Sequence, residues 1–121
     1  MKKIITLLVI AFSLQMNGQC FEKISAGGFH SSAIKTDGTL CVWGRNDHGQ
    51  VGDGTNIYKT VPTQIGMDTD WENISLGFIH SFAVKANGTL WGWGYNDSNQ
   101  LGDGTDINKN VPTQIGTDTD W

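Results

Sequence analysis

The chain contains little cysteine, little proline and few basic residues. Its 121 residues include two cysteines and two prolines, and 8 Lys and Arg stand against 12 Asp and Glu. Cys20 and Cys41 form no C-x-x-C pair, which excludes the common zinc and thiol–disulfide motifs. The scattered basic residues and the net charge of −4 argue against binding to nucleic acid or to an anionic membrane.

Helical periodicity is absent as well. Sixteen glycines and few alanines leave no sustained pattern of 3.6 residues, so a helical solenoid is excluded. Short apolar runs separated by turn residues predict an all-β chain instead.

The N-terminus carries the long apolar run of the sequence. Lys2 and Lys3 precede an apolar stretch at residues 4–14, which is too short to span a bilayer comfortably. The pattern predicts a secretory signal peptide over residues 1–19, hence an exported protein without a membrane span. A buried N-terminal strand or helix is the alternative. Cys20 raises the question of lipidation, but residues 17–19 match poorly the small apolar residues expected before a lipid-modified cysteine.

The rest of the sequence is a repeat. Residues 21–70 return as residues 71–120 without a gap, with 31 identities in 50 positions. Residue 121 is then the first position of a third copy. A repeat of this length predicts a solenoid or a propeller. We therefore divide the chain into a signal peptide, repeat 1 (residues 21–70), repeat 2 (residues 71–120) and one residue of a third repeat.

Each copy contains four short apolar runs. In the first copy we expect strands at residues 22–26, 31–35, 39–44 and 62–65. The dipeptides Asp37-Gly38 and Asn87-Gly88 predict β-hairpins, and Asn87-Gly88 suits a type I′ turn. Pro62 cannot donate a ladder hydrogen bond, so its strand should start at the proline or lie at an edge. Four short antiparallel strands for each repeat are typical of a β-propeller blade.

The repeat resembles a known family. The residues that carry the resemblance are Gly27, His30-Ser31, Gly38, Trp43-Gly44 and residues 50–55 (Gln-Val-Gly-Asp-Gly-Thr), with their counterparts in the second copy. They are similar to the regulator-of-chromosome-condensation repeat, here in a secreted bacterial member with two repeats. The resemblance implies a propeller of seven four-stranded blades. The family's eukaryotic namesake is a nuclear nucleotide-exchange factor that binds chromatin, a setting that an acidic exported chain does not fit. Secreted bacterial relatives include a β-lactamase inhibitor that binds through loops on one face.

Two blades make an incomplete ring. Blades stack through aromatic and aliphatic side chains, so two isolated blades should leave apolar outer faces bare. We expect either further blades or self-assembly to cover them. Our candidates for this packing are Phe21, Ile34, Leu40, Trp43, Trp71, Val84, Leu90, Trp91 and Trp93.

No catalytic, metal or cofactor site is predicted. His30-Ser31 and His80-Ser81 recur at one phase, as scaffold residues do, and neighbours in a strand point to opposite faces. Asp53 and Asp103 should each stabilise a Gly-Asp-Gly-Thr turn rather than bind calcium. Cys41 occupies the position of Trp91 in the second copy, which favours a buried thiol over a disulfide. The repeated tryptophans are expected in the core rather than stacked on sugars.

The differences between the copies suggest a contact surface. Substitutions cluster at residues 45–49 and 56–60 and at their counterparts, and Tyr and Arg are common anchors at interfaces. We predict partner-binding roles for Arg45, His48, Tyr58 and Tyr95, with drift of exposed loops as the alternative. The sequence thus indicates a non-enzymatic scaffold for protein–protein contact. A carbohydrate- or cell-surface-binding adhesion module is the second hypothesis, and an enzyme on the propeller face the third.

Overall fold

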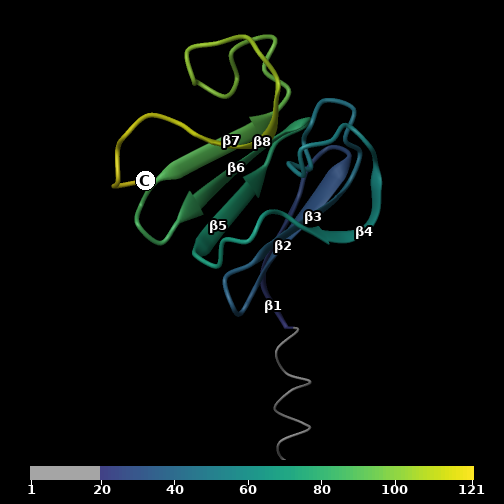
Figure 1. The fold of residues 1–121 in the computed structure, drawn as a ribbon, viewed down its shortest axis with the longest axis vertical. Helices are drawn as coiled ribbons and strands as arrows, with labels where there is room; N and C mark the ends of the chain where they lie inside the picture. Colours follow the sequence, from purple (N-terminus) through teal and green to yellow (C-terminus); the bar gives the residue numbers. More distant parts are fainter. Residues whose placement is uncertain (1–19) are drawn as a thin grey trace, which may run out of the picture.

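The computed structural model describes residues 20–121 as two four-stranded antiparallel sheets (Figure 1). Blade 1 comprises β1 (Phe21–Ala26), β2 (His30–Lys35), β3 (Leu40–Gly44) and β4 (Lys59–Gln64). Blade 2 comprises β5 (Trp71–Leu76), β6 (His80–Lys85), β7 (Leu90–Gly94) and β8 (Lys109–Gln114). The predicted signal peptide, residues 1–19, lies outside the described part of the chain.

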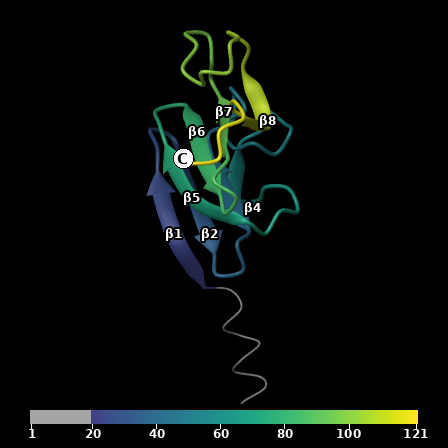
Figure 2. The same ribbon diagram turned by 90° about the vertical axis from the view of Figure 1, so that its left-hand side faces the viewer.

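Each blade is a simple meander. The spatial order of the strands is β1-β2-β3-β4 in one sheet and β5-β6-β7-β8 in the other. The two sheets pack side by side, with β5 against β1 and β2 (Figures 1 and 2). The prediction of two all-β propeller blades that do not close a ring is confirmed. Within residues 20–121 no helix is long and apolar enough to cross a membrane.

The hairpins form as expected, but the turn type predicted for Asn87-Gly88 is wrong. The amide of Gly88 donates to the carbonyl of Lys85 at 2.8 Å, so Ala86 and Asn87 are the central residues of the turn. Among the described residues the only non-glycine with a positive φ is Asn99, whereas a type I′ turn needs two such positions. The loop is instead three residues long and ends in Gly88, whose φ is 82°. Asn87 accepts hydrogen bonds from Thr89, which holds this turn.

Pro62 lies within an edge strand. β4 begins at Lys59, before the proline, and it pairs with β3 alone in its sheet. The expectation that the strand starts at Pro62 is wrong, and the alternative, an edge position, is confirmed. An edge strand tolerates proline because one side of its backbone has no partner.

The core lies between the blades. Ile34 and Leu40 of blade 1 are buried against Trp71 and Trp93 of blade 2, and Trp91 packs partly against them. These five members of the predicted packing set are confirmed. Other buried core residues are Val42, Val51, Ile65, Ile74 and Ala83.

The other members of that set lie on the outer faces, which two blades alone leave bare, as expected. Phe21 is 48% exposed, whereas Trp71, at the same position of the next copy, is 5% exposed. The physical reason is direction: Phe21 faces away from blade 2, so no neighbouring blade covers it. The same holds for Trp43, Val84 and Leu90, which are partly exposed.

The repeated His and Ser connect the blades. His30 Nε2 lies 2.9 Å from Ser81 Oγ, and Ser81 Oγ lies 2.9 Å from the carbonyl oxygen of Gln50. A carbonyl can only accept, so the Ser81 hydroxyl donates to Gln50 and accepts from Nε2–H of His30. Trp93 Nε1 donates to the same carbonyl at 2.9 Å. Structural hydrogen bonding of His30 is therefore confirmed, through a serine of the other blade.

Both cysteines are free thiols. Cys41 is buried and Cys20 is exposed. Burial raises the pKa of the Cys41 thiol. The prediction of a buried thiol at Cys41 is confirmed.

Candidate protein-contact surface

Two long loops leave the same end of the blades. Residues 45–58 join β3 to β4, and residues 95–108 join β7 to β8. The turns between β1 and β2 and between β5 and β6 lie at that end too, since β2 and β6 start there. Within each blade the strands run antiparallel, so the first turn and the long loop lie at the same end. Ring contacts between Phe29 and Phe78 and between His48 and Tyr95 join these ends across the blades.

A buried asparagine organises each long loop. Asn46 Nδ2 donates to the carbonyls of Thr55 and Ile57 at 2.8 and 3.0 Å, and its Oδ1 accepts from Val51 N at 2.9 Å. Asn96 makes the same set of bonds in the second copy. One fully buried side chain thus joins both ends of a glycine-rich loop, which gives the loop a defined shape.

Asp53 holds the Gly-Asp-Gly-Thr turn. Its Oδ1 accepts from the amide and the hydroxyl of Thr55 at 3.0 and 2.8 Å, and Lys59 Nζ lies 2.9 Å from Oδ2. Burial raises the pKa of Asp53, but these donors outweigh it and the net pKa is lowered. Asp103 has equivalent partners, and its pKa is lowered to about 2. The predicted structural role of both aspartates is confirmed. No group of three or more His, Cys, Asp or Glu in residues 20–121 could hold a metal ion.

An aromatic pair bridges the blades at the loop end. The rings of Phe29 and Phe78 are 5.1 Å apart and meet edge to face. Both side chains are exposed, at 49% and 64%. Phe78 lies against the backbone of Gly28, where a Cβ atom would come within 2.5 Å of its ring. Glycine in one copy therefore makes room for phenylalanine in the next.

Arg45 extends this pair into a charged group. Its guanidinium lies 5.1 Å from the centre of the Phe29 ring and contacts Asp47 through two nitrogens, at 2.9 and 2.6 Å. The hydrogen bonds from Arg45 lower the pKa of Asp47 to about 2, despite an opposing effect of burial. The bond to Asp47 raises the pKa of Arg45, and Tyr58 adds to that effect.

His48 and Tyr95 form a second contact across the blades. Their rings are 4.9 Å apart and nearly perpendicular, and His48 Nε2 lies 3.9 Å from Asp47. The charge of Asp97 raises the pKa of the Tyr95 hydroxyl. The contacts run without interruption from Phe78 to Tyr95.

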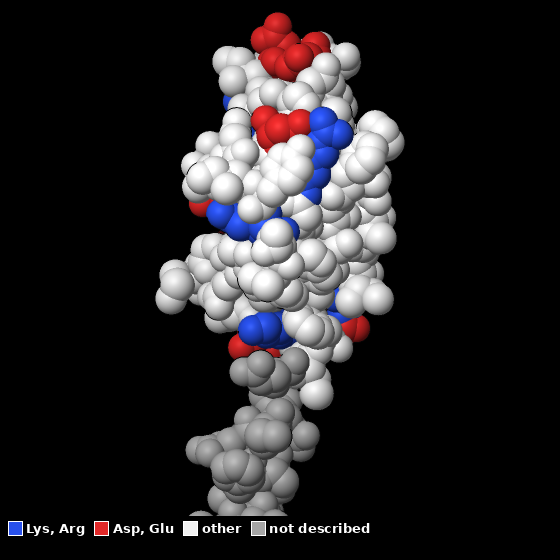
Figure 3. All heavy atoms as spheres, turned by 90° about the vertical axis from the view of Figure 1, so that its right-hand side faces the viewer, with Lys and Arg blue, Asp and Glu red and all other residues white. Residues whose placement is uncertain are grey.

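The four predicted residues therefore lie at one end of the molecule. Tyr58 is more than half exposed, and the other three are partly buried in the network. We call this set the loop-end surface; its members are Phe29, Arg45, Asp47, His48, Tyr58, Phe78 and Tyr95. Figure 3 shows a side of the molecule on which most atoms belong to uncharged residues; several basic side chains lie beside acidic ones, and an acidic group at the top stands apart.

Phe29 and Phe78 were not among the residues predicted from the sequence. When the two copies are aligned, Phe29 corresponds to Ile79 and Phe78 corresponds to Gly28. Both positions therefore vary between the copies, as the predicted positions do. A large aromatic residue directly after a glycine turn is the signal that identifies them.

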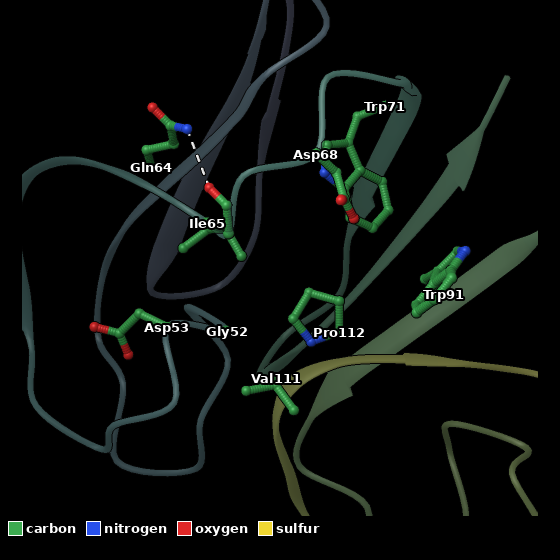
Figure 4. Close-up of a pocket in the computed structure, with 10 residues that line it drawn as sticks. Gly52, Asp53, Gln64, Ile65, Asp68, Trp71, Trp91, Val111 and Pro112 are labelled. Atoms are coloured by element: carbon green, nitrogen blue, oxygen red, sulfur yellow. Dashed lines mark hydrogen bonds between the residues drawn. The ribbon is translucent and has the colours of Figure 1, made fainter.

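A groove separates the outer parts of the blades (Figure 4). Its volume is about 310 Å³, and Asp53, Gln64 and Asp68 line it together with Trp71 and Trp91. Lys85 Nζ lies 4.8 and 4.4 Å from the ring centres of the two tryptophans, and 2.6 Å from Asp68. The lysine thus takes up part of the aromatic surface beside the groove.

The His30–Ser81 pair does not form a nucleophile in this arrangement. A serine nucleophile transfers its proton to the histidine, but the Ser81 hydroxyl donates to the Gln50 carbonyl. Ser81 is also fully buried, so a substrate has no access to it.

Comparison with known proteins agrees with this architecture. The chain is similar to the RCC1 domain-containing protein RUG3 and to the ultraviolet-B receptor UVR8, both of Arabidopsis thaliana. Each is 36% identical, over 50 and 55 residues that make up 41% and 46% of this chain. This chain covers 11% and 12% of the length of these relatives.

A solved structure shares the fold. Yeast RCC1 (Prp20), in its complex with Kap60, superposes with a TM-score of 0.76 at 27% identity, over 82% of this chain and 25% of that chain. The profile described as the regulator of chromosome condensation (RCC1) repeat matches residues 37–84 and 87–120. A second profile of that description matches residues 21–50 and 71–100. The chain belongs to the RCC1 repeat family.

Proposed function

We propose that this chain is an exported, non-enzymatic propeller segment that serves as a scaffold for protein–protein contact through its loop-end surface. The observation that carries the proposal is the exposed Phe29–Phe78 pair, bordered by Arg45 on one side and by the His48–Tyr95 contact on the other. Aromatic residues and arginine supply much of the binding energy at protein interfaces. The pair lies on two blades at once, so a partner would contact both repeats.

The rigidity of the surface supports this role. The loops are fixed by the Asn46 and Asn96 networks, and the turns are fixed by β-strands. A preorganised surface loses little conformational entropy when it binds. The relative Prp20 was crystallised bound to Kap60 and was studied for its binding to Gsp1p and histones, which makes protein partners the reasonable class for this chain.

Export is supported by the N-terminal sequence alone. Lys2 and Lys3 followed by an apolar stretch are typical of a secretory signal. Expression in a bacterial host with mass spectrometry of the product tests it. A mature N-terminus at residues 18–20, outside the cytoplasm, is the expected result. An intact cytoplasmic chain would contradict export, and a lipid on Cys20 would replace secretion by membrane anchoring.

The binding role is tested with a matched pair of variants. Immobilised chain captures proteins from the extracellular fraction of the source organism, and the partner that is identified is then purified. We expect Phe29→Ala with Phe78→Ala to weaken its binding at least tenfold, the equivalent of about 1.4 kcal/mol. Met67→Ala is the control, because Met67 is 86% exposed and lies between β4 and β5, at the opposite end of the blade. Equal affinity of both variants would contradict the assignment of the surface.

A carbohydrate- or cell-surface-binding module is the second candidate. The groove of Figure 4 favours it, because carboxylates and an amide line it together with Trp91, and sugars bind to such combinations of aromatic and polar groups. Retention on a polysaccharide that is lost with Trp91→Ala would support this candidate. Loss on replacement of Tyr58 and Tyr95 would place the sugar on the loop-end surface instead.

A further inference from the structure

The contact between the blades has two different sides, and each outer face of the molecule carries one of them. On the blade 1 side of the contact, His30, Ile34, Leu40 and Gln50 are buried. Their counterparts in blade 2, His80, Val84, Leu90 and Gln100, are partly exposed. Blade 2 thus presents on its outer face the counterparts of the residues with which blade 1 contacts blade 2.

The opposite face shows the reverse relation. Ile74 is 8% exposed within the contact, whereas its counterpart Ile24 is 79% exposed on the outer face of blade 1. Ser81 and Trp93 are fully buried, and their counterparts Ser31 and Trp43 are partly exposed. The outer face of blade 1 therefore presents the counterparts of the residues with which blade 2 contacts blade 1.

The alternation of side chains in β6 agrees with this division. Ser81, Ala83 and Lys85 are buried toward blade 1, while His80, Phe82 and Val84 are less buried and point to the other side. Successive residues of a strand face opposite sides of the sheet. One strand thus serves the existing contact with one face and offers a second contact with the other.

We propose that these two outer faces bind each other, so that copies of this chain associate head to tail. Ser31 and Trp43 of the incoming copy would meet His80 and the carbonyl of Gln100. They would repeat the bonds that Ser81 and Trp93 make to His30 and Gln50. A contact between unlike faces is heterologous, so each copy can bind one neighbour on each side.

The structure already shows the first step of this continuation. The amide of Trp121 donates to the carbonyl of Gly88 at 3.3 Å, just as the amide of Trp71 donates to the carbonyl of Gly38 at 3.2 Å. The edge of blade 2 thus receives the first residue of a following repeat in the same way as blade 1. Phe21 of the incoming copy would have to displace Trp121, which is 60% exposed, from this position.

Two positions distinguish the new contact from the existing one. Within the chain, Gly28 of blade 1 packs against Phe78 of blade 2. In the new contact Phe78 takes the place of Gly28, and Gly28 of the incoming copy takes the place of Phe78, so a glycine again faces a phenylalanine. Asn99 stands where blade 1 has Gly49, and a Cβ atom at Gly49 would come within 2.6 Å of the backbone of Asn110. Asn99 is therefore a steric obstacle, and the contact between copies is weaker than the contact within the chain.

Pairs of blades such as those of residues 20–121 cannot by themselves complete a ring of seven. Each copy contributes two blades, whereas the relatives form rings of seven. Copies supply even numbers of blades, so head-to-tail growth does not end in a seven-bladed ring. We expect a mass that rises with concentration, toward an open row of copies or a ring with an even number of blades.

The test is analytical ultracentrifugation of the full chain with two blocking variants. Ile24→Arg blocks the outer face of blade 1, and Val84→Arg blocks that of blade 2. Each variant alone should sediment as a single copy, and an equimolar mixture should form a dimer of one copy each, because each retains the face that the other lacks. Circular dichroism of each variant verifies the fold.

A third variant tests the same contact by a gain of affinity. Asn99→Gly removes the obstacle and keeps the positive φ of 59°, so it should tighten association about tenfold, the effect of relieving an overpacked site. The proposal is overturned if the unmodified chain stays a single copy at all concentrations. It is also overturned if both blocked variants associate as the unmodified chain does, or if Asn99→Gly leaves the association unchanged.

Discussion

His30 of the first repeat and Ser81 of the second share a hydrogen bond of 2.9 Å between Nε2 and Oγ, 51 positions apart in the chain. The adjacent pair His30-Ser31, which looks in the sequence like a unit, is thus divided between two blade interfaces. Histidine serves the contact with the following blade, and serine at this position serves the contact with the preceding one.

Replacement of Ser81 by Ala should destabilise the protein by about 1–3 kcal/mol, because Nε2–H of His30 would lose its acceptor inside the protein. Urea unfolding followed by tryptophan fluorescence measures this. Ser31→Ala is the matched control, since Ser31 occupies the same position on an outer face; in dilute solution its effect should stay within about 0.5 kcal/mol. Equal losses would assign the effect to the strand itself and not to the bond between blades.

Trp93→Phe should destabilise the protein by about 2–3 kcal/mol. The change removes the donor to the Gln50 carbonyl and part of a fully buried side chain, and both losses count in a packed core. Trp43→Phe should have a much smaller effect, because Trp43 is partly exposed. Thermal unfolding by circular dichroism compares the two. A larger loss for Trp43 would show that the inner strands, rather than the blade contact, need the indole.

Stability should fall as the pH decreases from about 6.5 to about 4. Burial, and then the charge of His80, lowers the pKa of His30 to about 4, so in this interval the unfolded chain binds a proton that the folded protein excludes. Linkage then makes the folded state less stable at lower pH, by an amount on the order of 2 kcal/mol. Below pH 4 this term is constant, and the carboxyl of Asp47, with its pKa of about 2, begins to contribute.

Urea unfolding at several pH values measures this dependence. His30→Gln should remove most of it and leave the smaller part due to His80, whose pKa burial also lowers. An unchanged slope in His30→Gln would show that another group carries the effect.

Asn46→Ala should destabilise the protein by roughly 2–4 kcal/mol, since several hydrogen bonds of about 1 kcal/mol each are lost and backbone groups remain unpaired. The loop at residues 45–58 should also become sensitive to limited proteolysis. Asn96→Ala should behave in the same way, because its bonds are the same. Asn56→Ala is the control: this exposed amide makes one long contact of 3.5 Å, and its replacement should leave the cleavage pattern unchanged.

Most local features could be read from the sequence. The repeat, its four strands and the glycine turns follow from short-range patterns, because alternation of side chains and turn geometry depend on residues close in the chain. The turn at Asn87-Gly88 shows where this reading ends. The dipeptide allows two hairpin types, and the backbone around it selects the longer one.

Part of the candidate site could be predicted from the sequence. Arg45, His48, Tyr58 and Tyr95 differ from their counterparts in the other copy, which was enough to choose them. Phe29 and Phe78 required the structure, because their ring contact joins turns of different blades. No pattern within one repeat indicates that two such turns meet.

From the residue pattern alone, residues 21–120 could be recognised as two RCC1-type blades with aromatic residues at repeated positions. Which copy of each position is buried became visible in three dimensions: Trp71 is covered and Phe21 is not, although both occupy the same place in their repeats. The reason is that burial here comes from the neighbouring blade. A local pattern fixes which way a side chain points, but not whether another blade stands there to cover it.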